Sequence, residues 1–322
     1  MRLLASAVIA LAVATPAAQL PKASHGQTVT VVARHVPTPT AFAFASGKVF
    51  VAGYGDANKP TPAGGVYVLG GGKAVPLAGA PTHVSGLAFA KGTLYVSANH
   101  TIAALTGWNG RAFATSRFVV DVPPSFTGFS GLAMGRNGLL YAGVANPLNG
   151  PSDYEAGTTP YANDVVTVDP ANGKIAVVAT GIRQPWQLLF APGHAAPLVS
   201  DLGQDNLGDK RPPDFLVEAT QGANFGFPSC PAKPASCASY TKPFLQFPPH
   251  ASPMGLGYLA GRLYVALYTG AGKGPEVVSL PVGGGRVVPF LTGFRSPIIA
   301  LGTHAGRVYV GAEDGTIYRV RP

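Results

Sequence analysis

Six segments of this chain repeat one pattern, and this repetition restricts the fold more than any other feature of the sequence. Each segment holds a short apolar strand, a turn with glycine, and a second strand that ends in small residues. The copies are AFAFASGKVFVAG (41–53), GLAFAKGTLYVSA (86–98), GLAMGRNGLLYAG (131–143), QLLFAPGHAAPLVSD (187–201), GLGYLAGRLYVAL (255–267) and IIALGTHAGRVYVGA (298–312). Their second strands recur at intervals of roughly 45–65 residues, within or above the range of propeller blades.

A third strand follows every copy, and a fourth is visible in several, such as KIAVVA (174–179) and RVVPFL (286–291). Six four-stranded units predict an all-β, six-bladed β-propeller. The last copy ends at Pro322 directly after its third strand, whereas residues 28–34 (TVTVVAR) form a strand without a unit. We therefore expect this N-terminal strand to complete the sixth blade and close the ring, which removes an exposed sheet edge.

The first residues resemble an export signal. Arg2 precedes an apolar run over residues 3–14, and small residues follow up to Ala18. We assign residues 1–24 to a signal peptide and 25–322 to the propeller. The run is shorter than the about 20 residues that span a bilayer, and no later segment is apolar over such a length. The sequence thus predicts a secreted or periplasmic protein without a membrane span, and an uncleaved anchor is the alternative.

The formal net charge is +9. No stretch interleaves Lys and Arg with aromatic residues as a nucleic-acid surface would, so we expect no nucleic-acid partner. Two interpretations stay open: general surface basicity, or a basic pocket for an anionic ligand.

The two cysteines, Cys230 and Cys237, lie in the short segment CPAKPASC. Export makes a disulfide between them the expected state. Closing this loop stabilises a fold by about 2–3 kcal/mol through loss of chain entropy in the unfolded state. A reactive thiol pair is the alternative.

First strands line the channel of a propeller, so the residues directly before them meet at the channel mouth. These residues are His83, Thr127, Arg183, Gln184, His250 and Arg295, and Lys273 lies in a loop on the same face. Guanidinium groups pair bidentately with carboxylates and phosphates, so the set predicts a site for a ligand with several such groups. For each residue a solvated loop position or a structural hydrogen bond is the alternative. The remaining histidines (His25, His100, His194 and His304) are interpreted as surface residues.

Three pieces of sequence around the fourth copy, VDPANGKIAVVATGIRQPWQLLF, LVSDLGQDNLGD and PDFLVEATQGANFGFPSC, resemble the glucose/sorbosone dehydrogenase family. Members of that family are soluble six-bladed quinoproteins that use pyrroloquinoline quinone (PQQ) and calcium. With the channel-mouth pattern, the resemblance implies quinone contacts from Arg183, Gln184, His250, Lys273 and Arg295. It also implies a calcium ion beside the backbone carbonyls of Gly203 and Gln204, with Asp205, Asp209 and Asp214 as candidate acids.

One position departs from the family. Its catalytic histidine precedes the first strand of blade 3, where this chain has Thr127 in PSFTGFSGL. Oxidising a hydroxyl by hydride transfer to a quinone needs a general base, which a threonine hydroxyl cannot supply at neutral pH. His83, one blade earlier, is the candidate replacement.

The resemblance therefore implies an exported sugar or aldehyde dehydrogenase with an atypical base, acting on a small sugar or aldehyde and passing electrons to an external acceptor. The alternative is a non-catalytic propeller that binds a ligand or a protein and has lost the base. A metal-dependent lactonase of similar shape is a third hypothesis. It would need acidic ligands around the channel, and the residues before the first strands include almost none.

Overall fold

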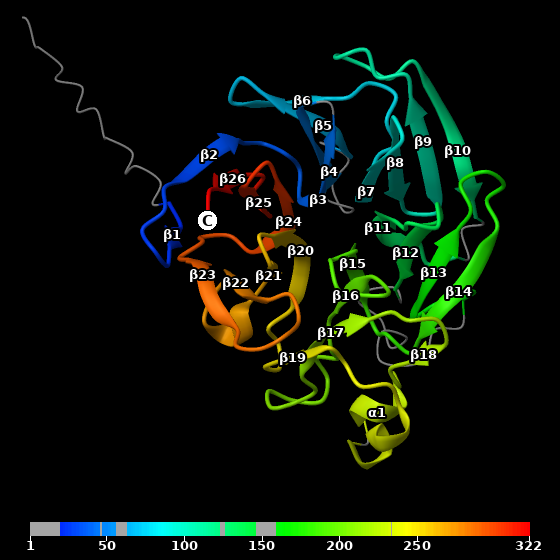
Figure 1. Cartoon of the computed structure of the whole chain (residues 1–322), viewed down its shortest axis with the longest axis vertical. Helices are drawn as coiled ribbons and strands as arrows, with labels where there is room; N and C mark the ends of the chain where they lie inside the picture. Colours follow the sequence, from blue (N-terminus) through cyan, green and yellow to red (C-terminus); the bar gives the residue numbers. More distant parts are fainter. Residues whose placement is uncertain (1–19, 46, 56–62, 123–125, 146–158, 233) are drawn as a thin grey trace, which may run out of the picture.

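The computed structural model describes residues 20–322 except 46, 56–62, 123–125, 146–158 and 233. In this part of the chain, six sheets stand around a central axis as the blades of a propeller (Figure 1). The predicted all-β, six-bladed fold is confirmed.

Each blade is an antiparallel meander that runs from the channel outward. Blade 1 contains β3 (Pro39–Ala45), β4 (Lys48–Gly55), β5 (Ala63–Gly70) and β6 (Lys73–Pro76), and blade 2 contains β7 (Val84–Ala90), β8 (Thr93–Ala98), β9 (Thr101–Thr106) and β10 (Thr115–Asp121). Blade 3 contains β11 (Phe129–Met134), β12 (Leu140–Val144), β13 (Asp164–Val168) and β14 (Ile175–Thr180), and blade 4 contains β15 (Pro185–Leu189), β16 (Leu198–Asp201), β17 (Asp214–Glu218) and β19 (Leu245–Phe247). Blade 5 contains β20 (Pro253–Leu259), β21 (Arg262–Leu267), β22 (Glu276–Pro281) and β23 (Val288–Thr292), and blade 6 contains β24 (Ile298–His304), β25 (Arg307–Ala312), β26 (Ile317–Val320) and β2 (Val29–Ala33).

The last blade takes its outer strand from the start of the chain. β2 pairs antiparallel with β26, from Val29 opposite Val320 to Ala33 opposite Ile317. This is the pairing expected of an N-terminal strand that closes the ring. A further short strand, β1 (Lys22–Ala23), pairs with β23 of blade 5.

The signal-peptide prediction falls almost wholly outside the described residues. Lys22 and Ala23 nevertheless belong to a blade, so the folded part of the chain begins before residue 25. A signal peptide cleaved near Ala18 would leave β1 intact.

The hydrophobic core lies between neighbouring blades. In one cluster, Phe50 and Val66 of blade 1 pack against Leu87 and Leu94 of blade 2. Near the axis, neighbouring first strands lie so close together that only small residues fit between them. A Cβ on Gly86 would lie 2.7 Å from the backbone nitrogen of Leu132 in the next blade. The inner strands therefore approach as closely as glycine permits.

Side-chain hydroxyls connect successive first strands around the axis. Thr40 donates to the carbonyl of Val84 at 2.7 Å, and Ser85 donates to the carbonyl of Phe129 at 2.7 Å. Gln187 of blade 4 crosses the channel, where its amide nitrogen donates to the carbonyls of Thr40 (2.9 Å) and Ser85 (3.2 Å). Gln187 is buried, so these contacts join blade 4 to blades 1 and 2 in the interior of the ring.

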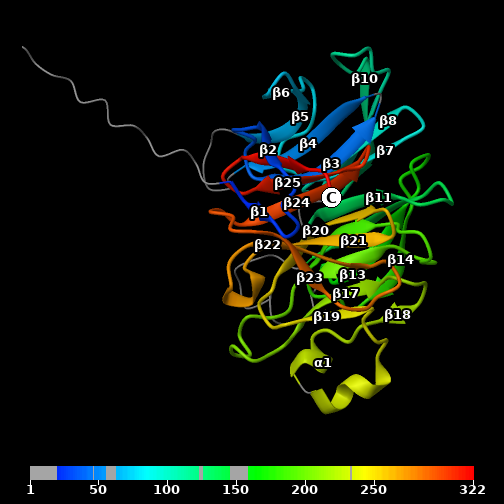
Figure 2. The same ribbon diagram turned by 60° about the vertical axis from the view of Figure 1, so that its left-hand side comes forward.

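Blade 4 carries a long excursion between its third and fourth strands. The excursion holds β18 (Ala223–Asn224), which joins β14 of blade 3 in parallel, then α1 (Ser229–Ala232) and η2 (Pro234–Ser239). Figures 1 and 2 show that it projects beyond the ring. The predicted disulfide is present between Cys230 and Cys237. No helix among the described residues is long and apolar enough to cross a bilayer.

The interpretation of His194 as a surface residue is wrong. Its side chain is 7% exposed and binds Glu218 at 3.2 Å. Its other ring nitrogen lies 2.9 Å from the carbonyl oxygen of Val282 in blade 5. His194 therefore connects two blades, which a single histidine in a turn sequence does not reveal.

Candidate functional site

Two buried polar side chains stand directly before the first strand of blade 4. Arg183 is 5% exposed and Gln184 is 4% exposed. The backbone N–H of Gln184 donates to Oδ1 of Asp201 at 2.9 Å, because Asp201 ends the neighbouring strand β16. Nη1 of Arg183 donates to the carbonyl oxygens of Leu202 (3.2 Å) and Gly203 (2.6 Å). The guanidinium thus holds the start of the loop over residues 202–213 against blade 4.

Asp201 is a buried carboxyl with an unusual protonation equilibrium. Burial raises its pKa to about 7, the backbone N–H of Gln184 opposes the shift, and the charge of Asp214 raises the pKa further. A substantial fraction of Asp201 is therefore neutral at physiological pH. The positive charge of Arg183 is then only partly compensated by this neighbour.

Asp214 connects blade 4 to blade 5. Its Oδ1 accepts the backbone N–H of Gly203 at 2.6 Å, and its Oδ2 accepts the backbone N–H of Ser252 at 2.6 Å. Burial raises the pKa of Asp214, and these two hydrogen bonds oppose that shift. Because Ser252 directly precedes β20, this one carboxyl group fixes the 202–213 loop relative to the start of blade 5.

His250 lies against the same loop. Its Nδ1 is 3.2 Å from Oδ1 of Asp205, and its Nε2 is 3.3 Å from the carbonyl oxygen of Gly208. Burial by itself lowers the pKa of His250, but the contacts with Gly208 and Asp205 and the charge of Asp214 raise it on balance. Both nitrogens face acceptors, so the doubly protonated ring satisfies both contacts. The structure therefore brings six of the predicted residues into one region: Arg183, Gln184, Gly203, Gln204, Asp205 and His250.

The two other predicted cations lie on blades 5 and 6. Lys273 is exposed and follows η3 (Gly270–Gly272), where its charge opposes the burial that raises the pKa of Glu276. Arg295 is also exposed. Burial raises the pKa of Tyr318, and the positive charge of Arg295 partly opposes this shift. Neither side chain is packed into the core.

The two positions connected with the catalytic base lie on blades 2 and 3. Oγ1 of Thr127 is 2.6 Å from Oγ1 of Thr159, so its hydroxyl is engaged with another hydroxyl. The ring of His83 contacts Tyr54 edge to face at 5.6 Å, and Oη of Tyr54 donates to Oδ1 of Asn99 at 3.3 Å. His83 is partly exposed, with an aromatic neighbour that limits its orientation.

The calcium ion implied by the family resemblance does not fit the loop in this arrangement. The carbonyl oxygen of Gly203 already accepts the guanidinium of Arg183, and two adjacent cations would repel each other. The side chain of Asp205 is 68% exposed and is directed to His250. Within the described ranges, no three His, Cys, Asp or Glu side chains form a cluster that could hold a metal ion. We therefore assign no role to calcium.

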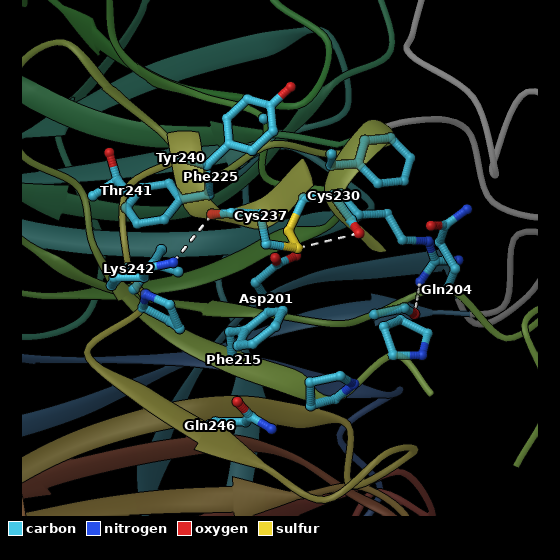
Figure 3. A pocket seen from close by; sticks show the side chains of 18 of the residues that line it. Asp201, Gln204, Phe215, Phe225, Cys230, Cys237, Tyr240, Thr241, Lys242 and Gln246 are labelled. Atoms are coloured by element: carbon cyan, nitrogen blue, oxygen red, sulfur yellow. Dashed lines mark hydrogen bonds between the residues drawn. A yellow bond between two sulfur atoms is a disulfide. The ribbon is translucent and has the colours of Figure 1, made fainter. Parts of the chain in front are cut away.

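Arg183 also lines a cavity of about 350 Å³ on the flank of blade 4, here termed the blade 4 cavity (Figure 3). Asp201, Gly203 and Gln204 also line it, together with Cys230, Cys237 and Tyr240 of the excursion. Its lining includes neither Gln184, His250, Lys273 nor Arg295. The convergence of these four residues with Arg183 on one cavity at the channel mouth stays a prediction.

The sequence did not reveal three features of this region: the near-neutral pKa of Asp201, the hydrogen bonds of Gln187 across the axis, and the blade 4 cavity. An acidic residue at the end of the buried strand PLVSD was the available signal for Asp201. The cavity depends on how a long excursion folds back, and local sequence patterns do not report that.

No protein-family model and no curated protein sequence matches this chain. Solved structures do match. A glucose dehydrogenase-type oxidoreductase from Thermus thermophilus has a TM-score of 0.72 at 19% identity, with 92% of this chain and 100% of that chain covered. The PQQ-bound form of an aldose sugar dehydrogenase from Streptomyces coelicolor has a TM-score of 0.71 at 17% identity, with 94% and 99% covered.

A gluconolactonase-type propeller is also similar, with a TM-score of 0.63 at 13% identity and 94% and 97% of the two chains covered. At these identities the likeness establishes the fold. The structural resemblance to sugar dehydrogenases that the sequence motifs predicted is confirmed at this level.

Proposed function

We propose that this propeller is a quinoprotein-type sugar or aldehyde dehydrogenase that binds PQQ over the channel mouth, between the residues that precede the first strands of blades 4, 5 and 6. The observation that supports this most is the buried pair Arg183 and Gln184. Oε1 of Gln184 is buried and has no hydrogen-bond partner among the described residues. A buried acceptor without a partner costs about 1–3 kcal/mol, which a donor on a ligand would offset.

The charges around this position favour a polycarboxylate. His250 has a raised pKa, and Lys273 and Arg295 are exposed cations on the adjacent blades. The buried guanidinium of Arg183 adds to the positive potential before blade 4, because its buried neighbour Asp201 is partly neutral. The side chain of Gln187 joins blade 4 to blades 1 and 2 across the axis, which would limit how far a ligand could enter the channel.

PQQ, when bound, supplies the hydride acceptor. The chain must then supply the sugar-binding groups and a base for the hydroxyl proton. His83 is the candidate base, with its ring oriented by Tyr54. Thr127 occupies the position of the base in the resembling family, and its hydroxyl is bonded to Thr159.

The proposal is tested by reconstituting the purified protein with PQQ, with and without calcium, and measuring dye reduction over a panel of aldoses and aldehydes. We expect slow PQQ-dependent turnover that the His83→Gln variant loses. A general base contributes about 10²–10⁴-fold, so Thr127→His should raise turnover by at least about tenfold. If neither the wild type nor Thr127→His reduces dye in a PQQ-dependent way, the proposed activity is refuted.

The second candidate is a propeller that binds a polycarboxylate without oxidising anything. The Thr127–Thr159 hydrogen bond favours it, since it fills the position of the missing base with a stable contact. This candidate predicts PQQ binding with no dye reduction by the wild type or by Thr127→His.

Export is part of the proposal, supported by the charged start and the apolar run of residues 1–18. Expression of the full chain in a bacterial host should yield a protein outside the cytoplasm whose N-terminus lies before Lys22. Recovery of only the uncleaved chain in the cytoplasm would contradict export.

A further inference from the structure

The excursion that forms the roof of the blade 4 cavity is held in place by backbone hydrogen bonds and a disulfide. The backbone N–H groups of Phe225 and Phe227 donate to the carbonyls of Thr180 and Gly181 at 3.0 Å each, which attaches the excursion to blade 3. The backbone N–H of Thr241 donates to the carbonyl of Asn224 at 2.8 Å, which closes the excursion on itself. The Cys230–Cys237 disulfide adds a covalent closure. The space below this roof is therefore a feature of the fold.

The walls of the cavity are apolar and aromatic. Figure 3 shows Phe215 of β17 on one side and Phe225 and Tyr240 of the excursion on the other. Val217 and Phe227 also line the cavity. A volume of about 350 Å³ lies in the range that proteins use for small molecules. Aromatic walls favour a flat ring system, which can stack or pack edge to face.

The charges of the lining are mostly positive. Arg183 is buried, whereas Arg211 and Lys242 are exposed residues of the lining. Asp201 is the acidic residue of the lining. None of the ion pairs formed by the described residues involves Arg211. Nζ of Lys242 donates to the carbonyl of Cys237 at 3.1 Å and keeps further protons for another acceptor.

We propose that the blade 4 cavity is a second ligand site, separate from the channel mouth, that binds small aromatic carboxylates. The ring lies between Phe215 and the aromatic residues of the roof. The carboxylate pairs with Arg211 and Lys242, which are the accessible cations of the lining. This site does not depend on PQQ binding or on catalysis.

The first test is calorimetry of the intact protein with 2-naphthoate and with 2-naphthamide, which has the same rings without the charge. We expect 2-naphthoate to bind at least about tenfold more tightly, because its carboxylate makes charge-assisted hydrogen bonds that the amide cannot make. Equal affinity for the two compounds, or no binding of 2-naphthoate at millimolar concentration, would refute the proposal.

The second test locates the site. Arg211→Gln and Lys242→Gln should each weaken 2-naphthoate about tenfold and leave 2-naphthamide unchanged. Lys210→Gln is the matched control, because Lys210 is exposed next to Arg211 and is not part of the lining. Both substituted positions are exposed, so the melting temperature should stay within about 2 °C of the wild type.

Arg295→Ala distinguishes the two sites. We expect unchanged 2-naphthoate affinity in this variant, whether or not the substitution weakens PQQ binding. If Arg295→Ala weakens 2-naphthoate and Arg211→Gln does not, the compound binds at the channel mouth and the second site is refuted.

Discussion

At the scale of single residues, the region before blade 4 depends on groups whose ionisation is set by burial. Asp201 and Asp214 are both buried and both have raised pKa values. Their carboxyl oxygens accept hydrogen bonds from the backbone N–H groups of Gln184, Gly203 and Ser252. Polar groups this deeply buried are tolerated because backbone donors satisfy them.

Asp201 predicts a measurable pH dependence of stability. Its pKa of about 7 in the folded protein exceeds the ordinary value of 3.8, so the folded state binds the proton more tightly. The stabilisation is therefore present below about pH 4 and is lost as the pH rises towards 7. Asp201→Asn keeps the acceptor for Gln184 and removes the titration. In urea unfolding, the wild type should lose about 2–3 kcal/mol more than Asp201→Asn between pH 5 and pH 8.

The control for this experiment is Asp209→Asn, since Asp209 is an exposed residue of the same loop. It should show the wild-type pH dependence. Parallel pH profiles for Asp201→Asn and the wild type would show that Asp201 is ionised at both pH values and contradict its raised pKa.

Replacement of Arg295 tests the proposed quinone site at the scale of one residue. Arg295→Ala should weaken PQQ binding by about tenfold, which corresponds to one charge-assisted contact at an exposed position. Arg286→Ala is the comparison, because Arg286 is also exposed but lies in the turn between β22 and β23, at the opposite end of the blades. Equal losses in the two variants would indicate non-specific attraction to a basic protein.

At the scale of elements, the first strands are joined by hydrogen bonds across the channel as well as by packing. Gln187 is the group that reaches furthest, from blade 4 to blades 1 and 2. Gln187→Leu keeps the approximate size and removes both donors, which leaves two buried carbonyls without this partner. The variant should lose about 1–3 kcal/mol of unfolding free energy in urea. Gln246→Leu, at an exposed position of β19, should lose less than about 0.5 kcal/mol.

The elements also show what the sequence could and could not predict. The second strands that begin at Lys48, Thr93, Arg262 and Arg307 lie within the segments identified from sequence, because apolar alternation and a glycine turn mark them locally. The parallel strand β18 and the short strand β19 were not predicted, since two or three residues carry no periodic pattern. Contacts with the 202–213 loop and with Asp214 connect the residues before blades 4 and 5. The buried contacts of Asp201, Asp214 and His194 depend on side chains far apart in sequence, so local patterns did not reveal them.

At the scale of the whole molecule, closure of the ring depends on residues from both ends of the chain. β2 completes blade 6, so its removal leaves β26 as an open edge. A chain that starts at Lys22 should fold and unfold in one cooperative transition. A chain that starts at His35 lacks β1 and β2 and should aggregate or melt at least about 10 °C lower. Equal melting temperatures for the two chains would contradict closure by β2.

The central claim is that a polycarboxylate quinone binds over the channel mouth, and calorimetric titration of the metal-free wild-type protein with PQQ tests it most directly. One titration contains calcium and the other contains a chelator. The account predicts saturable binding with one PQQ per chain in both, because the cations that attract the carboxylates belong to the protein and Arg183 occupies the carbonyl of Gly203. Absence of PQQ binding in both titrations would contradict the account.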